Sequence, residues 1–92
     1  MNRIEQMRAL LQQALAPAQV EVQDDSAQHA GHRGAAAGGG HYRVTIVAQA
    51  FDGMPLLARH RRIYEALAPM IGAQIHALSI RALAPAETAP DT

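Results

Sequence analysis

The chain has 92 residues, the size of one small domain, and its eight basic residues, all arginines, balance eight acidic residues to a net charge of zero. A neutral chain exerts no long-range attraction on nucleic acid or on anionic membranes, so a nucleic-acid site would need a local cluster of arginines. The absence of cysteine excludes disulfides and thiolate metal sites within the chain. The absence of a signal-peptide pattern or long apolar run predicts a soluble cytoplasmic protein, and the chain is expected to be a monomer when alone.

The first half of the chain predicts a helix followed by two strands. Residues 2–15 place apolar side chains at helical spacing, with Asn2 as the expected N-cap and Pro17 as the stop. Residues 20–23 alternate valine with polar residues, as in a short half-buried strand. Residues 24–40 have no periodicity and are rich in glycine and alanine, which predicts a flexible inter-strand loop.

The second half predicts strand, helix and strand. Residues 41–51 form a strand with one apolar face that consists of Tyr42, Val44, Ile46 and Ala48. After a turn at residues 52–53, a helix follows whose predicted buried stripe includes His60 together with Leu56, Ile63, Tyr64, Leu67 and Ile71. Pro69 should divide this helix and Gly72 should end it. Residues 75–83 form the third predicted strand.

This order, α-β-β-α-β, predicts an α+β fold with a mixed three-stranded sheet and both helices on one face. The first two strands should pair antiparallel across the loop, and the final β-α-β step favours a parallel third strand. The domain is expected to span residues 1–84, and residues 85–92 lack any pattern and are expected to form a disordered tail.

Histidines are the candidate ligands of the chain, which has five. If the third strand runs parallel to the strand that begins at His41, then His76 meets the loop that carries His29 and His32 at one end of the sheet. A strand histidine and a loop histidine that converge in this way can form a metal site. The alternative is a histidine at the rim of the core that is hydrogen-bonded to the backbone, because His76 alternates with apolar residues of its own strand.

Three motifs in a fixed order suggest a family. Residues 51–64 read F-D-G-M-P-L-L-A-R-H-R-R-I-Y, residues 75–80 read I-H-A-L-S-I, and H-A-G-H lies in the upstream loop. The combination of F-x-G, R-H-R-x-I-Y and I-H-A-L resembles the BolA family over residues 4–85. The resemblance implies a fold similar to the type II KH fold. It also implies a non-enzymatic protein that binds a monothiol glutaredoxin and shares a [2Fe-2S] cluster with it, in cluster trafficking, cluster assembly or iron regulation.

The resemblance also implies ligands for that cluster. The histidine of I-H-A-L, here His76, would bind iron together with a histidine from the loop. His29 lies where the family places its loop ligand and is favoured, and His32 follows three residues later as the other candidate. His41 occupies the family's H-[FY] position and is expected to pack near the loop. The partner and glutathione would supply the sulfur ligands, because this chain has no cysteine.

Arginines are the candidate contacts to anions. Arg59 and Arg62 are three residues apart, which predicts a shared helical face that binds phosphate, glutathione carboxylates or an acidic partner, or else is simply solvated. Some BolA-like proteins regulate transcription, so the resemblance also implies DNA binding, to which Arg43, Arg59, Arg62 and Arg81 would contribute. The phosphate clamp of KH domains needs the sequence G-x-x-G, but Gly53 is followed by M-P-L with no second glycine. The sequence therefore argues against single-stranded RNA binding of the KH kind. An enzyme is the least favoured reading, because no nucleophile motif or paired carboxylates are present.

Overall fold

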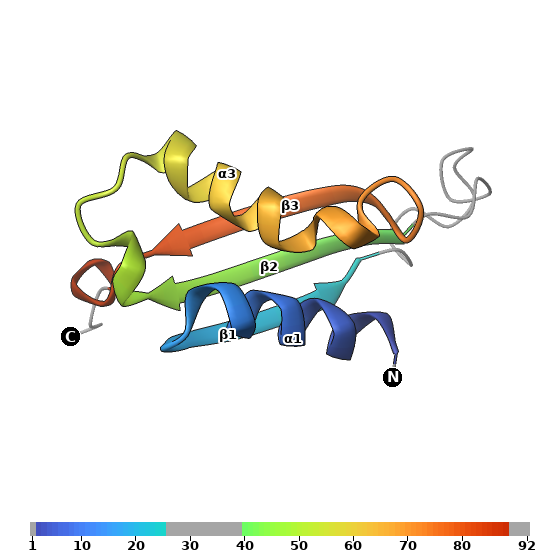
Figure 1. The fold of residues 1–92 in the computed structure, drawn as a ribbon, viewed down its shortest axis with the longest axis horizontal. Coiled ribbons are helices and arrows are strands. Elements are labelled where there is room, and N and C mark those ends of the chain that lie inside the picture. The colour runs from blue at the N-terminus through green and yellow to red at the C-terminus, as the bar shows by residue number, and fades with distance from the viewer. Residues whose placement is uncertain (1, 26–39, 89–92) are drawn as a thin grey trace.

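The computed structural model describes residues 2–25 and 40–88. Its helices and strands are α1 (Arg3–Leu15), β1 (Ala18–Asp24), β2 (Gly40–Ala48), α3 (Leu56–Leu67) and β3 (Ile75–Leu83). Short 3-10 turns within the described ranges are η2 (Gln49–Phe51), η3 (Ala68–Met70) and η4 (Pro85–Glu87). The strand order is β1-β2-β3, with β1 antiparallel and β3 parallel to β2 (Figure 1). The predicted α+β fold and mixed sheet are therefore confirmed.

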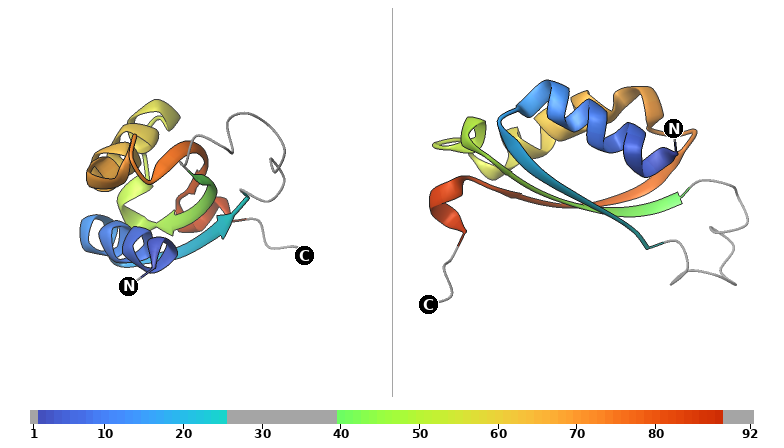
Figure 2. Two further views of the ribbon diagram at one scale, coloured as in Figure 1. Left: turned by 90° about the vertical axis from the view of Figure 1, so that its right-hand side faces the viewer. Right: turned by 90° about the horizontal axis from the view of Figure 1, so that it is seen from below.

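Both helices cover the same face of the sheet, and the other face is open to solvent (Figure 2). The predicted apolar face of β2 is confirmed, because alternate side chains are buried from Tyr42 to Ala48. They pack in one cluster with apolar side chains of the two helices, which include Met7, Leu11, Leu15, Ile63 and Leu67. The intervening residues of β2 belong to the open face, and Arg43 is exposed there.

The two ends of α1 follow the sequence signals. The side-chain oxygen of Asn2 accepts a hydrogen bond of 2.8 Å from the N–H of Glu5, which confirms the predicted N-cap. The helix ends at Leu15, and Pro17 cannot continue it because proline has no backbone N–H. Gly72 was predicted to end the second helix, but α3 ends at Leu67 and η3 ends at Met70, two residues earlier. Gly72, with a positive φ of 93°, lies instead in the turn that leads to β3.

The buried stripe of α3 differs from the predicted one. Arg59, Ile63 and Leu67 face the core at a spacing of four residues, and His60 is only half-buried. Arg59 can occupy an inward position because several hydrogen-bond acceptors surround its guanidinium, and this shifts the stripe by one residue. Predicted stripe residues that are exposed instead are Leu56 at 60%, Tyr64 at 43% and Ile71 at 39%.

The predicted disordered tail is wrong for its first residues. Pro85–Glu87 forms η4, and the carboxylate of Glu87 accepts hydrogen bonds from both terminal nitrogens of Arg59. The same carboxylate accepts a hydrogen bond of 2.8 Å from the N–H of Ala84. These bonds tie the segment after β3 to α3, so the folded domain extends beyond residue 84; residues 89–92 lie outside the described ranges.

We expect Glu87→Gln to lower the midpoint of thermal unfolding at pH 7, with Glu65→Gln on the exposed side of α3 as the unchanged control. The hydrogen bonds from Arg59, and then the N–H of Ala84, lower the pKa of Glu87 to about 2. A carboxylate with a depressed folded pKa stabilises the protein above its unfolded pKa, and this contribution disappears as the pH falls through the folded value. The difference between Glu87→Gln and the parent chain should therefore shrink between about pH 4.5 and pH 2. Equal midpoints at pH 7 would contradict this role.

Candidate functional site at the start of β2 and β3

The parallel strands β2 and β3 begin at the same end of the sheet, and their pairing shifts by one residue there. Gly40 pairs with Ile75 and His41 pairs with Ala77, so His76 is the extra residue of β3. An extra residue in one strand changes the direction of its side chain. Accordingly, Ile75 is buried in the core while His76 is exposed.

His41 and His76 are neighbours across this end of the sheet. Their ring centroids are 5.4 Å apart and the rings are inclined by 37°. His41 precedes the buried Tyr42 and therefore belongs to the open face of β2, where it is half-buried. The prediction that β3 brings His76 to the strand end that carries the loop is confirmed. The two loop candidates, His29 and His32, lie outside the described residues, so their ligand role stays a prediction.

Backbone hydrogen bonds hold the segments around both histidines. The N–H groups of Asp25, Gly40 and Gly72 donate to the carbonyls of His41, Gln74 and Ile75, at 2.8, 3.0 and 3.0 Å respectively. The Cα of Gly40 lies close to a core ring, because a Cβ placed there would be 2.4 Å from Cε2 of Tyr42. The histidine pair therefore rests on a backbone that is tied at both strands and closely packed.

The donor chemistry of this end fits a shared metal site. Within residues 2–25 and 40–88, no three His, Asp or Glu side chains gather closely enough to hold a metal ion by themselves. The chain has no cysteine, so any thiolate must come from another molecule. The exposed imidazole of His76 can supply one nitrogen ligand to a cluster that a second molecule also ligates.

The four predicted anion-binding arginines lie in three different places. Arg59 is 6% exposed and bonded to Glu87, so the expected surface shared by Arg59 and Arg62 is not formed. Arg62 lies against α1 and donates a bond of 3.3 Å to the carbonyl of Ala14. Arg43 and Arg81 line one shallow hollow of about 370 Å³ on the open face of the sheet, together with Gln23, Thr45, Ser79 and Ile80.

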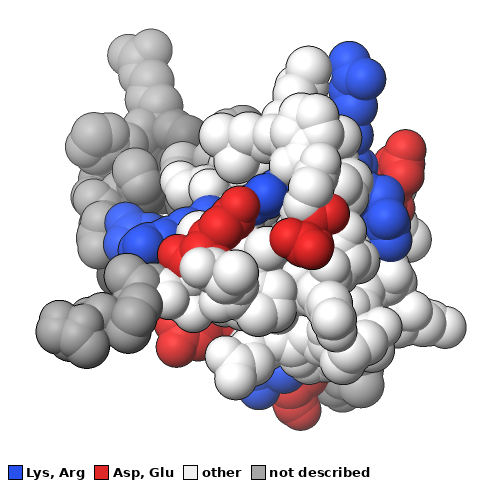
Figure 3. All heavy atoms as spheres, turned by 90° about the vertical axis from the view of Figure 1, so that its left-hand side faces the viewer, with Lys and Arg blue, Asp and Glu red and all other residues white. Residues whose placement is uncertain are grey.

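Arg43 also has an acidic neighbour, because one of its terminal nitrogens lies 3.3 Å from a carboxylate oxygen of Asp25. At the end of the molecule that carries η4, basic and acidic side chains are interspersed among uncharged ones (Figure 3). That view shows no continuous basic surface. Of the four predicted arginines, Arg43 and Arg81 are the two that lie together, on the open face of the sheet.

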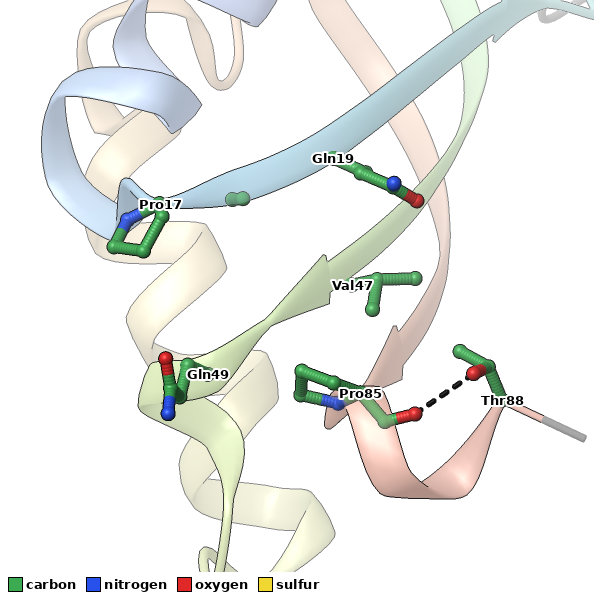
Figure 4. Close-up of a pocket in the computed structure, with 7 residues that line it drawn as sticks. Pro17, Gln19, Val47, Gln49, Pro85 and Thr88 are labelled. Atoms are coloured by element: carbon green, nitrogen blue, oxygen red, sulfur yellow. Dashed lines mark hydrogen bonds between the residues drawn. The ribbon is translucent and has the colours of Figure 1, made fainter.

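A larger hollow, of about 510 Å³, lies between the start of β1 and the segment after β3 (Figure 4). It is lined by uncharged residues, which are Pro17, Ala18, Gln19, Val47, Gln49, Pro85 and Thr88. The hydroxyl of Thr88 donates a bond of 2.7 Å to the carbonyl of Pro85 at its rim. A lining without titratable side chains offers no imidazole or carboxylate that could act as general acid, general base or transition-metal ligand. None of the described helices is long and apolar enough to cross a membrane.

Comparison with known sequences decides the family. The family described as BolA-like protein matches residues 11–87. The chain belongs to this BolA-like family. It is 40% identical to the protein BOLA1, chloroplastic, of Arabidopsis thaliana over 95% of this chain, and it spans 56% of that protein. The solved structure of BolA1 from Arabidopsis thaliana superposes with a TM-score of 0.82 at 37% identity, covering 97% of this chain and 99% of that one.

A further BolA-like relative carries a different kind of name. The "DNA-binding transcriptional regulator BolA" of Escherichia coli (strain K12) is 34% identical over 83% of this chain and 70% of its own length. The three motifs that carry the resemblance fall at two ends of this BolA-like domain. Phe51 ends η2, which follows β2, and Arg59 is bonded to Glu87 of η4, so both lie at one end of the sheet, whereas His76 lies at the other end, where β3 begins.

Sequence reasoning missed the role of Glu87. The sequence signal for this role is weak. Glu87 lies three positions after Ala84, as the acidic residue of a capping box does, but the N-cap position is alanine and not the usual serine or threonine. The contact between His41 and His76 was also missed, although the parallel pairing of β2 and β3 implies it.

Proposed function

We propose that this BolA-like chain is a non-enzymatic iron–sulfur partner protein. It binds a monothiol glutaredoxin and co-ligates a [2Fe-2S] cluster through His76 and a loop histidine, His29 or His32, in cluster trafficking, cluster assembly or iron regulation. The observation that carries the proposal is the exposure of His76 as the extra residue of β3. It stands at the end of the sheet from which residues 26–39 connect β1 to β2.

The division of ligands between the two molecules follows from composition. This chain supplies imidazoles only, so the glutaredoxin and glutathione supply the sulfur ligands. A cluster with this mixed ligation supplies one-electron redox chemistry and exchangeable iron and sulfide. Imidazole is a weaker, protonatable ligand compared with thiolate, which suits a cluster that is handed on to another protein.

We expect His76→Ala to abolish the shared cluster. The purified chain is mixed anaerobically with a monothiol glutaredoxin, glutathione, iron and sulfide, and the visible circular dichroism is recorded. The parent chain should give a spectrum distinct from that of the glutaredoxin homodimer, and His76→Ala should return the homodimer spectrum. The half-buried His60 of α3 provides the control, because His60→Ala should leave the mixed spectrum unchanged.

Loop variants then identify the second ligand. His29→Ala and His32→Ala, measured in the same assay, should differ, with the ligand variant losing the mixed spectrum. A parent chain that gives only the homodimer spectrum would overturn the proposal for this protein.

The alternative function is a DNA-binding regulator, which the name of the Escherichia coli relative favours. In this chain such a role would rest on Arg43 and Arg81, since Arg59 is bonded to Glu87. Phosphate contacts make affinity fall steeply with salt. Duplex binding that is salt-dependent and weakened by Arg43→Ala and Arg81→Ala would support this alternative, and a flat salt response would remove it.

A further inference from the structure

We propose that His41 and His76 form a binding site for a single divalent transition-metal ion such as zinc, which the chain binds without a partner protein. Their ring centroids are 5.4 Å apart. A tetrahedral zinc ion lies about 2.0–2.1 Å from each imidazole nitrogen, which places the centroids of two ligating rings about 5 Å apart. The observed separation is thus close to that of two imidazoles that share one tetrahedral ion.

The backbone around the pair favours binding, because little rearrangement is needed. The carbonyl of His41 accepts a hydrogen bond from Asp25, and the residues that flank the pair, Gly40 and Ile75, are hydrogen-bonded to Gln74 and Gly72. The proposed site therefore requires the two rings to turn their nitrogens toward one ion while the backbone keeps these hydrogen bonds. A site that is already assembled loses less conformational entropy when its ligand binds.

The chemistry of the pair selects the class of ion. Two neutral imidazoles suit zinc, nickel and copper, whereas calcium and magnesium prefer oxygen ligands. His76 is exposed, so water can complete the coordination on its solvent side. With two protein ligands the ion remains exchangeable.

This site differs from the proposed cluster site in its ligands and its requirements. It uses His41, which the cluster does not, and it needs neither glutathione nor a glutaredoxin. It shares His76 with the cluster, so a bound zinc ion and the cluster exclude each other. A zinc ion bound to His76 would therefore have to dissociate before His76 could ligate a cluster whose thiolates the partner supplies.

The test titrates Zn²⁺ into the full chain by calorimetry and follows the histidine ring nitrogens by NMR. We use His29→Gln/His32→Gln as the background, so that loop histidines cannot contribute. One equivalent of Zn²⁺ should shift the ring nitrogens of both His41 and His76. Affinity should fall at least about tenfold in His41→Phe and in His76→Gln, since removal of a ligand costs at least as much as removal of a residue that orients one. His60→Gln is the control and should bind as the background does.

The substitutions separate this proposal from misfolding and from the cluster proposal. His41→Phe keeps a ring against His76 but has no ring nitrogen, and His76→Gln alters an exposed side chain. Unchanged zinc affinity in either variant, or loss of binding in the loop background, would overturn the zinc site. Made in the parent chain, where both loop histidines are present, His41→Phe should still form the mixed cluster with the glutaredoxin. Failure of the cluster assay alone would leave the zinc titration as predicted.

Discussion

Replacing Phe51 with alanine is expected to destabilise the domain by about 3–5 kcal/mol, the usual cost of removing a large aromatic side chain from a core. Phe51 is 0% exposed and is the single phenylalanine of the chain. Its ring also lies 5.8 Å from Cζ of Arg59, so the cavity would remove the apolar support of the guanidinium that holds Glu87. The loss is measured by urea unfolding at pH 7.

The control for this prediction is Leu57→Ala. Leu57 is 63% exposed, so its removal should change the free energy of unfolding by no more than about 0.5 kcal/mol. Phe51→Leu keeps an apolar side chain and should lower the free energy of unfolding by an intermediate amount. It can be compared with Leu57→Ala even if Phe51→Ala does not fold. A cost for Phe51→Ala no larger than for Leu57→Ala would show that the ring does not support the core.

Local sequence patterns were enough to predict most of the fold. The two-residue alternation in β2 identified its buried face, and the bounds predicted for β3, residues 75–83, are those observed. The positive φ of Gly72, in the turn before β3, likewise has a local steric cause. These features depend on neighbouring residues, so sequence carries them directly.

The position of Arg59 depends on distant residues, and this is why its role was mispredicted. Its carboxylate partner, Glu87, is 28 residues away, and its carbonyl partner, Ala82, is 23 residues away. A helical pattern ranks side chains by polarity, so it assigned Arg59 to the surface and Leu56 to the core. The acceptors that satisfy a buried guanidinium come from the end of β3 and from η4, which only the folded chain brings together.

The candidate site, like the fold, was predictable only in part. Parallel pairing of β2 and β3 brings their first residues together, which placed His76 near the loop without any knowledge of side chains. The one-residue shift after Gly40 was not predictable, because it is a property of the pairing between the strands. That shift exposes His76 next to His41, which is the arrangement on which the proposed metal site rests.

Substitution of Gly40 by alanine is expected to test this link between packing and site. The added Cβ would lie 2.4 Å from Cε2 and 2.7 Å from the hydroxyl oxygen of Tyr42, whose side chain is buried, so the ring or the strand must move. Overpacking of this kind costs about 1–3 kcal/mol. Because Gly40 adjoins His41, the same movement should weaken the contact between His41 and His76, which nuclear Overhauser effects between the two rings report.

Gly53→Ala is the matched control for Gly40→Ala. Gly53 has a φ of 76° and nothing lies within 4 Å of an added Cβ, so its substitution costs about 1–2 kcal/mol through backbone strain alone. It lies in the turn before α3, at the opposite end of the sheet from His76 (Figure 1). Both variants should lose stability, but only Gly40→Ala should disturb the histidine rings. If the two variants leave the ring contact equally intact, the packing of Gly40 on Tyr42 does not set the geometry of the site.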